Sequence, residues 1–506
     1  MHRRSRARLL AAAVVIAAAA SVATAAGQAT AAPAQVSAAG AAHFVVLGDE
    51  GRGLSAVEKA VRDSGGTVVK SWPQIGVVVA SSDKADFAKV VRTKRGVQGA
   101  GATRNLAELV TPEPTTARIA ASADSARSLE ATESVVTNGG KGVPSDPGDP
   151  LSVNQWNLAA IKADKAHSIS GGSRDVVVGV LDSGIEATHP DLAPNIDASR
   201  SVGCTDQGVP NTSPAAWAPT TSDHGTHVAG IIAAAKNGVG VVGVAPNVKL
   251  ASIKVVDDDQ FIYPEYAICG FVWAAEHGVK VTNNSYFIDP WFLWCRNDAD
   301  QRAVVTAVTR AIDYSDRRGV VNVAALGNSN WDLSHNITDS GSPNNGTPTT
   351  RETGPECVNI PAETHGVVGV SATGVNNLKS YYSNYGRTET EVAAPGGDRM
   401  QVPGTPDANG RILSTVVGGA WGYKQGTSMA SPHAAGVVAL IRSTHRNWSA
   451  DRVVDELQHD ADRLACPAGG DYDPDGTGAW KAKCEGGASG RGFYGAGLID
   501  ALDAVR

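Results

Sequence analysis

Three short stretches of the sequence carry side chains that together could cleave an acyl bond. Asp182 follows an apolar run at residues 176–181, His224 opens the stretch HGTHVAGIIAA, and Ser428 lies within GTSMASPHAAG at residues 426–436. A serine hydroxyl is a poor nucleophile by itself, but it reacts when a histidine accepts its proton and a carboxylate holds that histidine in the required tautomer. The three residue types therefore predict nucleophilic acyl transfer, provided that the fold brings them together.

These features also have simpler interpretations. Asp182 taken alone could form a turn, because Asp-Ser-Gly recurs at residues 63–65 and 339–341. Two such turns facing each other would instead suit an aspartic protease. His224 and His227 could ligate zinc from one helix face, but the sequence has no H-E-x-x-H motif and offers no obvious third ligand. We expect His227 to be structural.

The position of a helix start helps to decide which serine reacts. The N-terminus of a helix supplies backbone N–H donors and partial positive charge, both of which stabilise a developing oxyanion. Ser431 is the rival serine, but it lies further into the predicted helix, next to Pro432. We expect His433 to have a structural role, either in packing or in capping. The sequence therefore favours Ser428 as the nucleophile.

Composition and the N-terminal residues indicate where the protein acts. Of the 506 residues, 42% are hydrophobic and 19% charged, which is typical of a globular chain, and the net charge of −7 argues against nucleic acid as the main partner. Residues 2–8 are basic, residues 9–20 are apolar, and residues 23–25 give an A-x-A pattern. This is the pattern of a secretory signal peptide, and the apolar run is too short to span a membrane. We expect a secreted, extracellular product without membrane contact.

A small domain and a linker are predicted between the signal peptide and the main domain. An order of strand, helix, strand, strand and helix indicates an α+β unit with an antiparallel sheet. Residues 111–150 are rich in Ala, Ser, Thr, Gly, Pro and Glu without a lasting period, which is typical of a linker. The predicted elements of the small unit are strands at 44–47, 67–70 and 75–80 and helices at 55–65 and 83–92.

From about residue 151 the chain alternates between apolar runs and amphipathic stretches. This alternation predicts an α/β fold, a parallel sheet with helices on both faces, in which polar functional groups gather at the carboxyl ends of the strands. The apolar runs are residues 176–181, 250–256, 279–281, 320–325 and 367–371, and the helical stretches include residues 266–277 and 304–317.

The three motifs, in the order Asp182, His224, Ser428, resemble the subtilisin family of serine proteases over residues 151–506. The resemblance implies that Ser428 is the nucleophile, that His224 is the general base and then the general acid, and that Asp182 orients the imidazole. Asn328, in the stretch AALGN, matches the family's oxyanion-hole asparagine. Its amide would share the oxyanion with the Ser428 backbone N–H.

The upstream α+β unit resembles the family's propeptide, an intramolecular chaperone and inhibitor that is removed on maturation. The predicted organisation is a signal peptide at residues 1–26, a propeptide at 27–110, a linker at 111–150 and a subtilisin-like peptidase domain at 151–506. The predicted partners are protein or peptide substrates and the chain's own propeptide, and we expect a monomer.

The resemblance implies a serine endopeptidase made as a preproenzyme, with no cofactor required for the reaction. Residues 235–241 resemble the family's calcium loop, with Asp191 and Gln155 as side-chain partners, so a structural calcium ion is a further expectation. The alternative is a non-catalytic binding module on the same scaffold. The presence of every catalytic residue type argues against it.

Two segments depart from the family pattern. Residues 283–291 read NNSYFIDPW, so bulky side chains replace the glycines that usually line the substrate cleft. An extended peptide would still bind by strand addition. Residues 329–355 are long, polar and rich in Gly, Asn, Thr and Pro. We expect them to form a solvated insertion loop near the cleft rather than a determinant of specificity.

The six cysteines form an even set, and an extracellular compartment permits disulfides. Cys466 and Cys484 flank a Gly- and Asp-rich stretch and are the expected local pair. The sequence leaves the other pairings open. No C-x-x-C motif is present to support a redox or zinc-ribbon site.

Overall fold

The computed structural model describes residues 41–104, 135–136 and 149–506, so the predicted signal peptide and most of the predicted linker lie outside the described residues. Residues 41–104 form the predicted α+β unit. Its antiparallel sheet has the order β2-β3-β1-β4, with two helices in the predicted places. The elements are β1 (Ala42–Leu47), α1 (Ser55–Asp63), β2 (Thr67–Trp72), β3 (Val77–Ser82), α2 (Phe87–Val91) and β4 (Gly99–Ala102).

Both faces of this small sheet are buried, which explains the unbroken apolar run in β1. Phe44 and Val46 pack with α1 and α2, whereas Val45 and Leu47 point to the opposite face and pack with α8 (Pro264–Glu276) and α9 (Ala299–Arg317). Successive strand residues face opposite sides, so each face receives every second side chain. Arg310 on α9 reinforces the second contact by donating to the Gly48 carbonyl at 2.9 Å.

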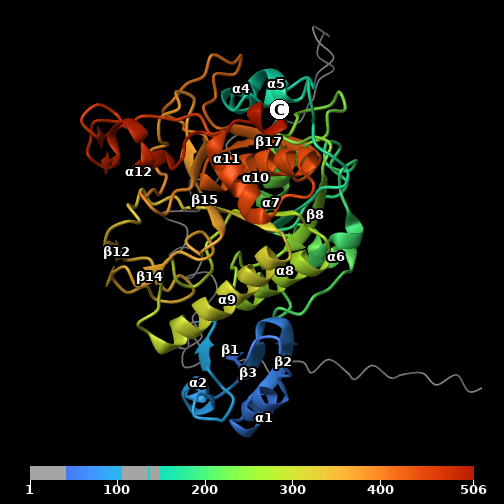
Figure 1. Cartoon of the computed structure of the whole chain (residues 1–506), viewed down its shortest axis with the longest axis vertical. Coiled ribbons are helices and arrows are strands. Elements are labelled where there is room, and N and C mark those ends of the chain that lie inside the picture. Colours follow the sequence, from blue (N-terminus) through green and yellow to red (C-terminus); the bar gives the residue numbers. More distant parts are fainter. Residues whose placement is uncertain (1–40, 105–134, 137–148) are drawn as a thin grey trace, which may run out of the picture. The chain divides into compact units, whose positions relative to one another are not determined.

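The main sheet has seven strands in the order β16-β15-β11-β9-β6-β8-β7, and all neighbouring pairs are parallel (Figure 1). Strand β6 lies near its centre and pairs with β8 and β9. The strands are β6 (Val177–Asp182), β7 (Val202–Gly203), β8 (Lys249–Lys254), β9 (Val281–Asn284), β11 (Val321–Ala325), β15 (Val367–Thr373) and β16 (Val392–Pro395).

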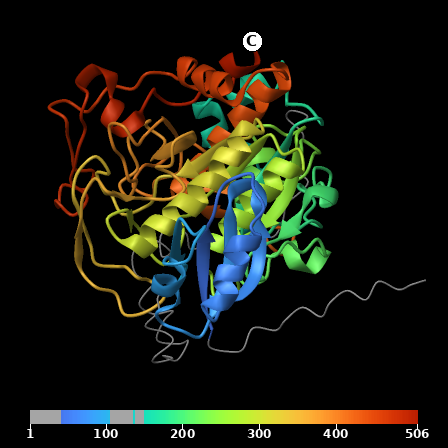
Figure 2. The same cartoon turned by 60° about the horizontal axis from the view of Figure 1, so that its bottom comes forward.

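Helices cover both faces of this sheet. Val178 and Val180 of β6 pack in one cluster with α7 (His224–Ala233) and α10 (Thr427–Thr444), whereas Val177 and Leu181 pack with α8 and α9 on the other face. Figure 2 shows α8, in yellow-green, beside α9, in yellow. A strand that is buried on both sides needs an apolar residue at nearly every position, so the predicted fold class is confirmed.

The remaining elements are short, apart from α11, and they connect or extend this framework. A second small sheet has the order β17-β18-β5. These elements are α4 (Trp156–Ala160), α5 (Ala163–Ala166), α6 (Pro214–Trp217), α11 (Ala450–His459), α12 (Arg491–Tyr494), β5 (Val135–Val136), β10 (Trp294–Cys295), β12 (Ile337–Asp339), β13 (Arg351–Thr353), β14 (Cys357–Val358), β17 (Ile412–Val416), β18 (Ala420–Lys424), β19 (Asp471–Tyr472) and β20 (Ala482–Lys483).

All six cysteines are paired. Cys466 bonds Cys484, as predicted, and the two pairings that the sequence left open are Cys204–Cys269 and Cys295–Cys357. The first of these joins the end of β7 to α8. Within residues 41–104, 135–136 and 149–506, no helix has the length and apolar character needed to cross a bilayer.

Two histidines in the core are held neutral by burial. The Nε2 atom of His227 lies 3.1 Å from the carbonyl oxygens of both Ile412 and Gly422, so this nitrogen carries the proton that the ring donates. Burial, together with the nearby Lys424 ammonium, lowers the pKa of His227 to about 3. Burial also lowers the pKa of His433 to about 4.

We expect the His227→Gln variant to lose part of the acid sensitivity of folding. The unfolded chain binds a proton as the pH falls through 6.5, whereas the folded chain does so only near pH 3. Stability is therefore fully present above this window and falls by about 1.4 kcal/mol for each pH unit below 6.5. Glutamine can donate to the same carbonyls without titrating, so the free energy of unfolding should depend less steeply on pH.

The measurement is the free energy of unfolding as a function of pH, made for the parent chain and for the His227 variant. The control is His335→Gln, because the His335 side chain is 58% exposed. Equal slopes for the parent and the His227 variant would contradict the expectation.

Candidate active site

Asp182 and His224 form a hydrogen-bonded pair at the carboxyl edge of the main sheet. Asp182 is the last residue of β6 and His224 is the first residue of α7. The Nδ1 atom of His224 lies 2.8 Å from Oδ1 and 3.0 Å from Oδ2 of Asp182. Because Nδ1 donates its proton to the carboxylate, the other ring nitrogen, Nε2, is left as the basic atom.

Local backbone contacts fix this pair. The Asp182 side chain is only 1% exposed, and its Oδ1 also accepts the Ser183 N–H at 2.7 Å. The Ser183 hydroxyl in turn accepts the N–H of Gly225 at 2.9 Å. A Cβ atom at Gly225 would lie 2.5 Å from the Gly184 carbonyl oxygen, so only glycine lets α7 approach the end of β6 this closely.

Ser428 is the second residue of α10, where the helix exposes its N-terminal donors. The Ser285 hydroxyl donates to the Ser428 carbonyl at 2.8 Å, and the Ser428 hydroxyl donates to the Ser285 carbonyl at 3.3 Å. These contacts join the first turn of α10 to the end of β9. The sequence placed residues 283–291 at the substrate cleft but did not single out Ser285.

Asn328 follows β11 by three positions and lies against the start of α10. Its Oδ1 accepts the backbone N–H of Thr427 at 2.8 Å and the Thr427 hydroxyl at 2.9 Å. With the carboxamide oxygen turned toward Thr427, the Nδ2 donor faces the other way. The Thr427 hydroxyl also accepts the Gly327 N–H at 3.0 Å, so one side chain fixes both residues.

The four residues singled out from the sequence line one pocket. Its remaining wall is largely apolar and aromatic, with contributions from residues 286–293 and 325–333. The lining residues are Asp182, Ser183, Ser222, His224, Val256, Gln260, Ile262, Ser285, Tyr286, Phe287, Asp289, Phe292, Leu293, Ala325, Gly327, Asn328, Ser329, Trp331, Leu333, Asn359, Asn384, Thr427 and Ser428.

Two titratable neighbours have shifted pKa values. Burial alone would raise the pKa of Asp223, but the Lys424 ammonium at 2.9 Å lowers it, so this carboxylate stays ionised at the start of α7. Burial raises the pKa of Tyr286 well above its usual value, and the nearby Asp182 carboxylate raises it further. Tyr286 therefore remains a neutral phenol.

The rival residues are occupied elsewhere. His227 donates to two backbone carbonyls and does not join His224 as a ligand. The Ser431 hydroxyl donates to Asn283 Oδ1 at 2.9 Å. Asp63 is paired with Lys59, and Asp339, the carboxylate of the third Asp-Ser-Gly, is paired with Arg351. Neither of these two aspartates lines the pocket.

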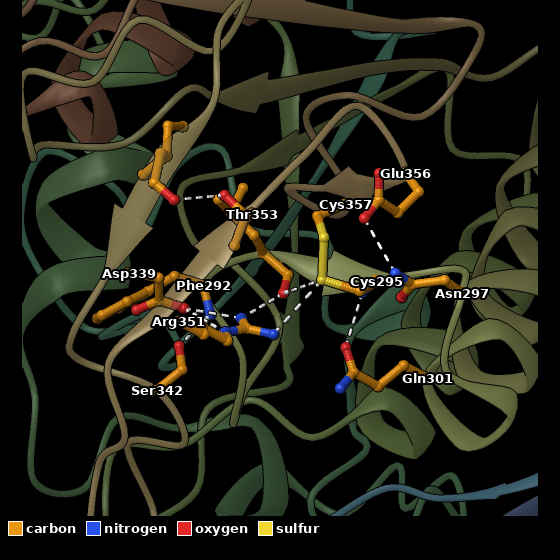
Figure 3. The surroundings of a disulfide bond; sticks show 12 residues. Phe292, Cys295, Asn297, Gln301, Asp339, Ser342, Arg351, Thr353, Glu356 and Cys357 are labelled. Atoms are coloured by element: carbon orange, nitrogen blue, oxygen red, sulfur yellow. Dashed lines mark hydrogen bonds and ion pairs between the residues drawn. A yellow bond between two sulfur atoms is a disulfide. The ribbon is translucent and has the colours of Figure 1, made fainter.

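The segment at residues 329–355 is not the solvated loop that its composition suggested. It contains the β12–β13 hairpin, and Asp339 is fully buried beside Arg351. Arg351 bonds Oδ2 of Asp339 through Nε at 2.9 Å and Nη2 at 2.7 Å, and Nη2 also donates to the Leu293 carbonyl at 2.5 Å (Figure 3). Composition misled here because the charged and polar residue types that form this buried pair are also the types found in solvated loops.

This segment shapes the pocket. Trp331 and Leu333 belong to it and line the pocket together with Phe292 and Leu293. The Phe292 ring contacts the Trp331 ring edge-on, with 5.9 Å between the centroids. The Phe292 N–H donates to Ser342 Oγ at 2.9 Å, close to the Cys295–Cys357 disulfide (Figure 3). The insertion therefore contributes Trp331 and Leu333 to the pocket wall and holds Phe292 beside them.

The expected calcium loop is held by hydrogen bonds. Asp191 Oδ2 accepts the Val241 N–H at 3.0 Å, and Gln155 Oε1 accepts the Val242 N–H at 3.0 Å. Asp149 Oδ1 accepts three successive backbone N–H groups, those of residues 237–239. Asp149 Oδ2 and Asp191 Oδ1 are both buried without a hydrogen-bond partner in the described part of the chain, and carboxylate oxygens are among the ligands that calcium takes. A structural calcium ion at this loop therefore stays a prediction.

The fold and the pocket define an α/β protein with a hydroxyl, an imidazole, a carboxylate and a carboxamide gathered at the carboxyl edge of a parallel sheet. The family model described as "Subtilase family" matches residues 173–484, which is more than half of the chain. The protein belongs to the subtilase family of serine proteases, as the resemblance predicted.

Two named relatives and one solved structure are also similar to this chain. The chain is 29% identical to fervidolysin of Fervidobacterium pennivorans over 62% of its own length and 42% of that protein. It is 33% identical to subtilisin NAT of Bacillus subtilis subsp. natto over 61% of its length and 66% of the relative. The crystal structure of an epidermin leader peptide processing serine protease from Staphylococcus aureus matches 92% of this chain and 98% of its own, with a TM-score of 0.63 and 19% identity, and so supports the fold.

We expect Arg351→Met to destabilise the protein strongly, because it leaves the Asp339 carboxylate buried without its ionic partner. The cost of breaking such a pair is about 3–5 kcal/mol in the free energy of unfolding. The matched control is Arg446→Met, whose pair with Asp175 is 60% and 67% exposed. Exposed pairs contribute at most about 1 kcal/mol. Denaturant unfolding of both variants in the Ser428→Ala background measures the difference, and equal losses would contradict the expectation.

Proposed function

We propose that this protein is a secreted serine endopeptidase that hydrolyses peptide bonds through an acyl-enzyme intermediate. The observation that carries the proposal is the hydrogen-bonded pair of Asp182 and His224 on the wall of a pocket that Ser428 also lines. An imidazole oriented by a carboxylate is the group that activates a serine hydroxyl. Membership of the subtilase family supports the same activity.

In the proposed reaction, Ser428 Oγ attacks the carbonyl carbon of the scissile bond while its proton passes to His224 Nε2. Asp182 stabilises the resulting imidazolium through Nδ1–H and is not itself protonated. The imidazolium then protonates the leaving amine, and the acyl group stays on Ser428. A water molecule, activated by the same imidazole, releases the acid and restores the serine. The proposed chemistry uses groups of the protein itself and a water molecule, and it needs no cofactor.

Negative charge that develops on the carbonyl oxygen needs donors already in place. The proposed donors are Asn328 Nδ2 and the Ser428 backbone N–H at the start of α10. The contact of Asn328 Oδ1 with Thr427 supports this role, because it commits the carboxamide oxygen to Thr427 and so sets Nδ2 as the donor on the other side of the carboxamide. Preorganised donors of this kind are usually the largest single contribution to catalysis.

The proposed substrates are proteins or peptides bound in an extended conformation near the end of β9, where strand addition supplies backbone hydrogen bonds. One substrate side chain would enter the pocket beside Phe287, Phe292 and Trp331. Because these rings form much of the wall, the pocket favours apolar side chains over charged ones.

We also propose that residues 1–26 direct export and that residues 27–110 are a propeptide, removed by cleavage within residues 111–150. The way in which residues 41–104 bury apolar residues against α8 and α9 supports a chaperone role for this unit. Its Arg104 reaches the Tyr266 hydroxyl on α8 at 2.8 Å. The mature enzyme would act as an extracellular monomer.

The decisive experiment is Ser428→Ala. The variant should lose proteolysis of casein and covalent labelling by a phosphonofluoridate, because both need the hydroxyl oxygen. Ser431→Ala is the matched control, and it should keep labelling because that hydroxyl is bonded to Asn283. Labelling that persists in the first variant would refute the assignment of the nucleophile.

The processing steps predict a defined mature N-terminus. N-terminal sequencing of the protein from the culture medium should place it within residues 111–150. The Ser428→Ala protein, expressed alone, should retain residues 27–110 if maturation is autocatalytic. A secreted, active protein that still begins near residue 27 would contradict the propeptide assignment.

A further inference from the structure

We propose that Asn384 is a positioning residue for catalysis, which holds the loop around Asn328 so that its amide meets the oxyanion. The inference rests on the proposed function and goes beyond it, because Asn384 belongs to none of the three motifs. It lies in the stretch YSNYG at residues 382–386, which sequence reasoning did not single out. Its side chain is buried and lines the pocket.

The Asn384 carboxamide accepts two hydrogen bonds from the residues that follow Asn328. Its Oδ1 receives the backbone N–H of Ser329 at 2.9 Å and that of Trp331 at 2.9 Å. These two donors are the backbone of the turn that carries the chain away from Asn328. One oxygen atom therefore fixes the exit of the loop.

Asn384 also fixes the entry of the loop. Its Nδ2 donates to the Leu326 carbonyl at 2.9 Å, and its own backbone N–H donates to the Gly327 carbonyl at 2.9 Å. Asn328 is thus bracketed on both sides by a single residue. Only a carboxamide of this length can accept two N–H groups and donate to a carbonyl at once, because a carboxylate cannot donate and a serine reaches less far.

The conformation of Gly327 agrees with this close approach. Its φ angle is +107°, and a Cβ atom there would lie 2.5 Å from Asn384 Nδ2. A side chain at position 327 would therefore be strained and would also push the carboxamide away. On the opposite side, Thr427 bonds both Gly327 and Asn328. The loop is clamped between the start of α10 and Asn384.

Neighbouring contacts hold Asn384 itself against the loop. The Asn330 N–H donates to the Tyr382 carbonyl at 2.7 Å, and the Tyr385 N–H donates to the Trp331 carbonyl at 3.0 Å. The segments on each side of Asn384 are therefore paired with the loop by backbone bonds that a substitution at 384 leaves in place. The side chain adds three further contacts, to the backbone of Leu326, Ser329 and Trp331.

The catalytic consequence follows from the geometry that an oxyanion donor needs. The donor must lie within hydrogen-bond reach of the oxygen in the transition state, and a misplacement of about 1 Å can cost about 10²-fold in rate. Asn384→Ala removes the three side-chain bonds and lets the loop relax. We expect kcat to fall by about 10²-fold, while KM stays within about threefold, because the loss falls on the transition state.

A double-mutant cycle with Asn328→Ala separates positioning from general damage. If Asn384 acts through the Asn328 amide, the Asn384 substitution should cost less than about threefold in kcat once that amide is gone. Losses of kcat that multiply fully in the double variant would overturn the proposal, as would a loss that appears mainly in KM. Rates are taken per active site, titrated with a phosphonofluoridate on the mature protein.

A matched control and a milder variant guard against simple misfolding. Asn322 is a fully buried asparagine on β11, bonded to Thr282 and Ser315 and not to the loop. Asn322→Ala should lower stability without changing kcat. If Asn384→Ala fails to mature, Asn384→Asp keeps both acceptors and loses only the donor to Leu326, and kcat should still fall with KM unchanged. Unchanged kcat in that variant would overturn the proposal.

The outcome is distinguishable from failure of the proposed function. If Ser428→Ala remains active and labelled, the nucleophile assignment fails whatever the double-mutant cycle gives. If activity depends on Ser428 but the Asn328 and Asn384 substitutions act independently, the enzyme assignment stands and the positioning role of Asn384 is rejected.

Discussion

The site depends on keeping one carboxylate out of water beside an imidazole. Asp182 is almost fully buried at the end of β6, and burying a carboxylate is costly unless donors reach it. The donors come from the Ser183 backbone and from His224. Gly225 then becomes necessary, because α7 must begin directly against the strand end. The hydrogen bond that lowers the free-energy cost of burying the carboxylate also fixes the tautomer of the histidine.

The two-sided burial of the main sheet follows from this requirement for a fixed edge. With α7 and α10 packed on one face and α8 and α9 on the other, the carboxyl ends of β6, β9 and β11 cannot shift independently. The pocket lies at that edge, and α10 directs its N-terminal donors into it. Asp182, His224 and Ser428 therefore lie at the end of a strand and at the starts of two helices, and packing fixes the positions of these elements.

Much of this could be predicted because it is encoded locally. The run at residues 176–181 is apolar at almost every position, since β6 is buried on both faces, and the long motifs around His224 and Ser428 mark two helix starts. Strand β4, with the sequence GAGA, was missed because small residues carry no β preference and its pairing with β1 is a tertiary contact. The short strands β7 and β16 were also missed, because each is defined by its pairing with a neighbouring strand of the sheet and not by a local pattern.

The parts of the site that could not be predicted are those in which distant segments meet. Asn384 contacts residues 326–331 across more than fifty positions of sequence, and no local pattern marks an asparagine that accepts two backbone donors. The insertion at residues 329–355 has the composition of a solvated loop, yet its Arg351 and Asp339 are brought together in a buried ion pair that supports the aromatic wall of the pocket. In both cases neutral or paired polar groups, rather than apolar ones, hold the loop. Composition cannot distinguish a polar residue that faces water from one that faces a backbone N–H. The motifs therefore predict the reacting groups, whereas the residues that hold those groups in position are visible only in the folded chain.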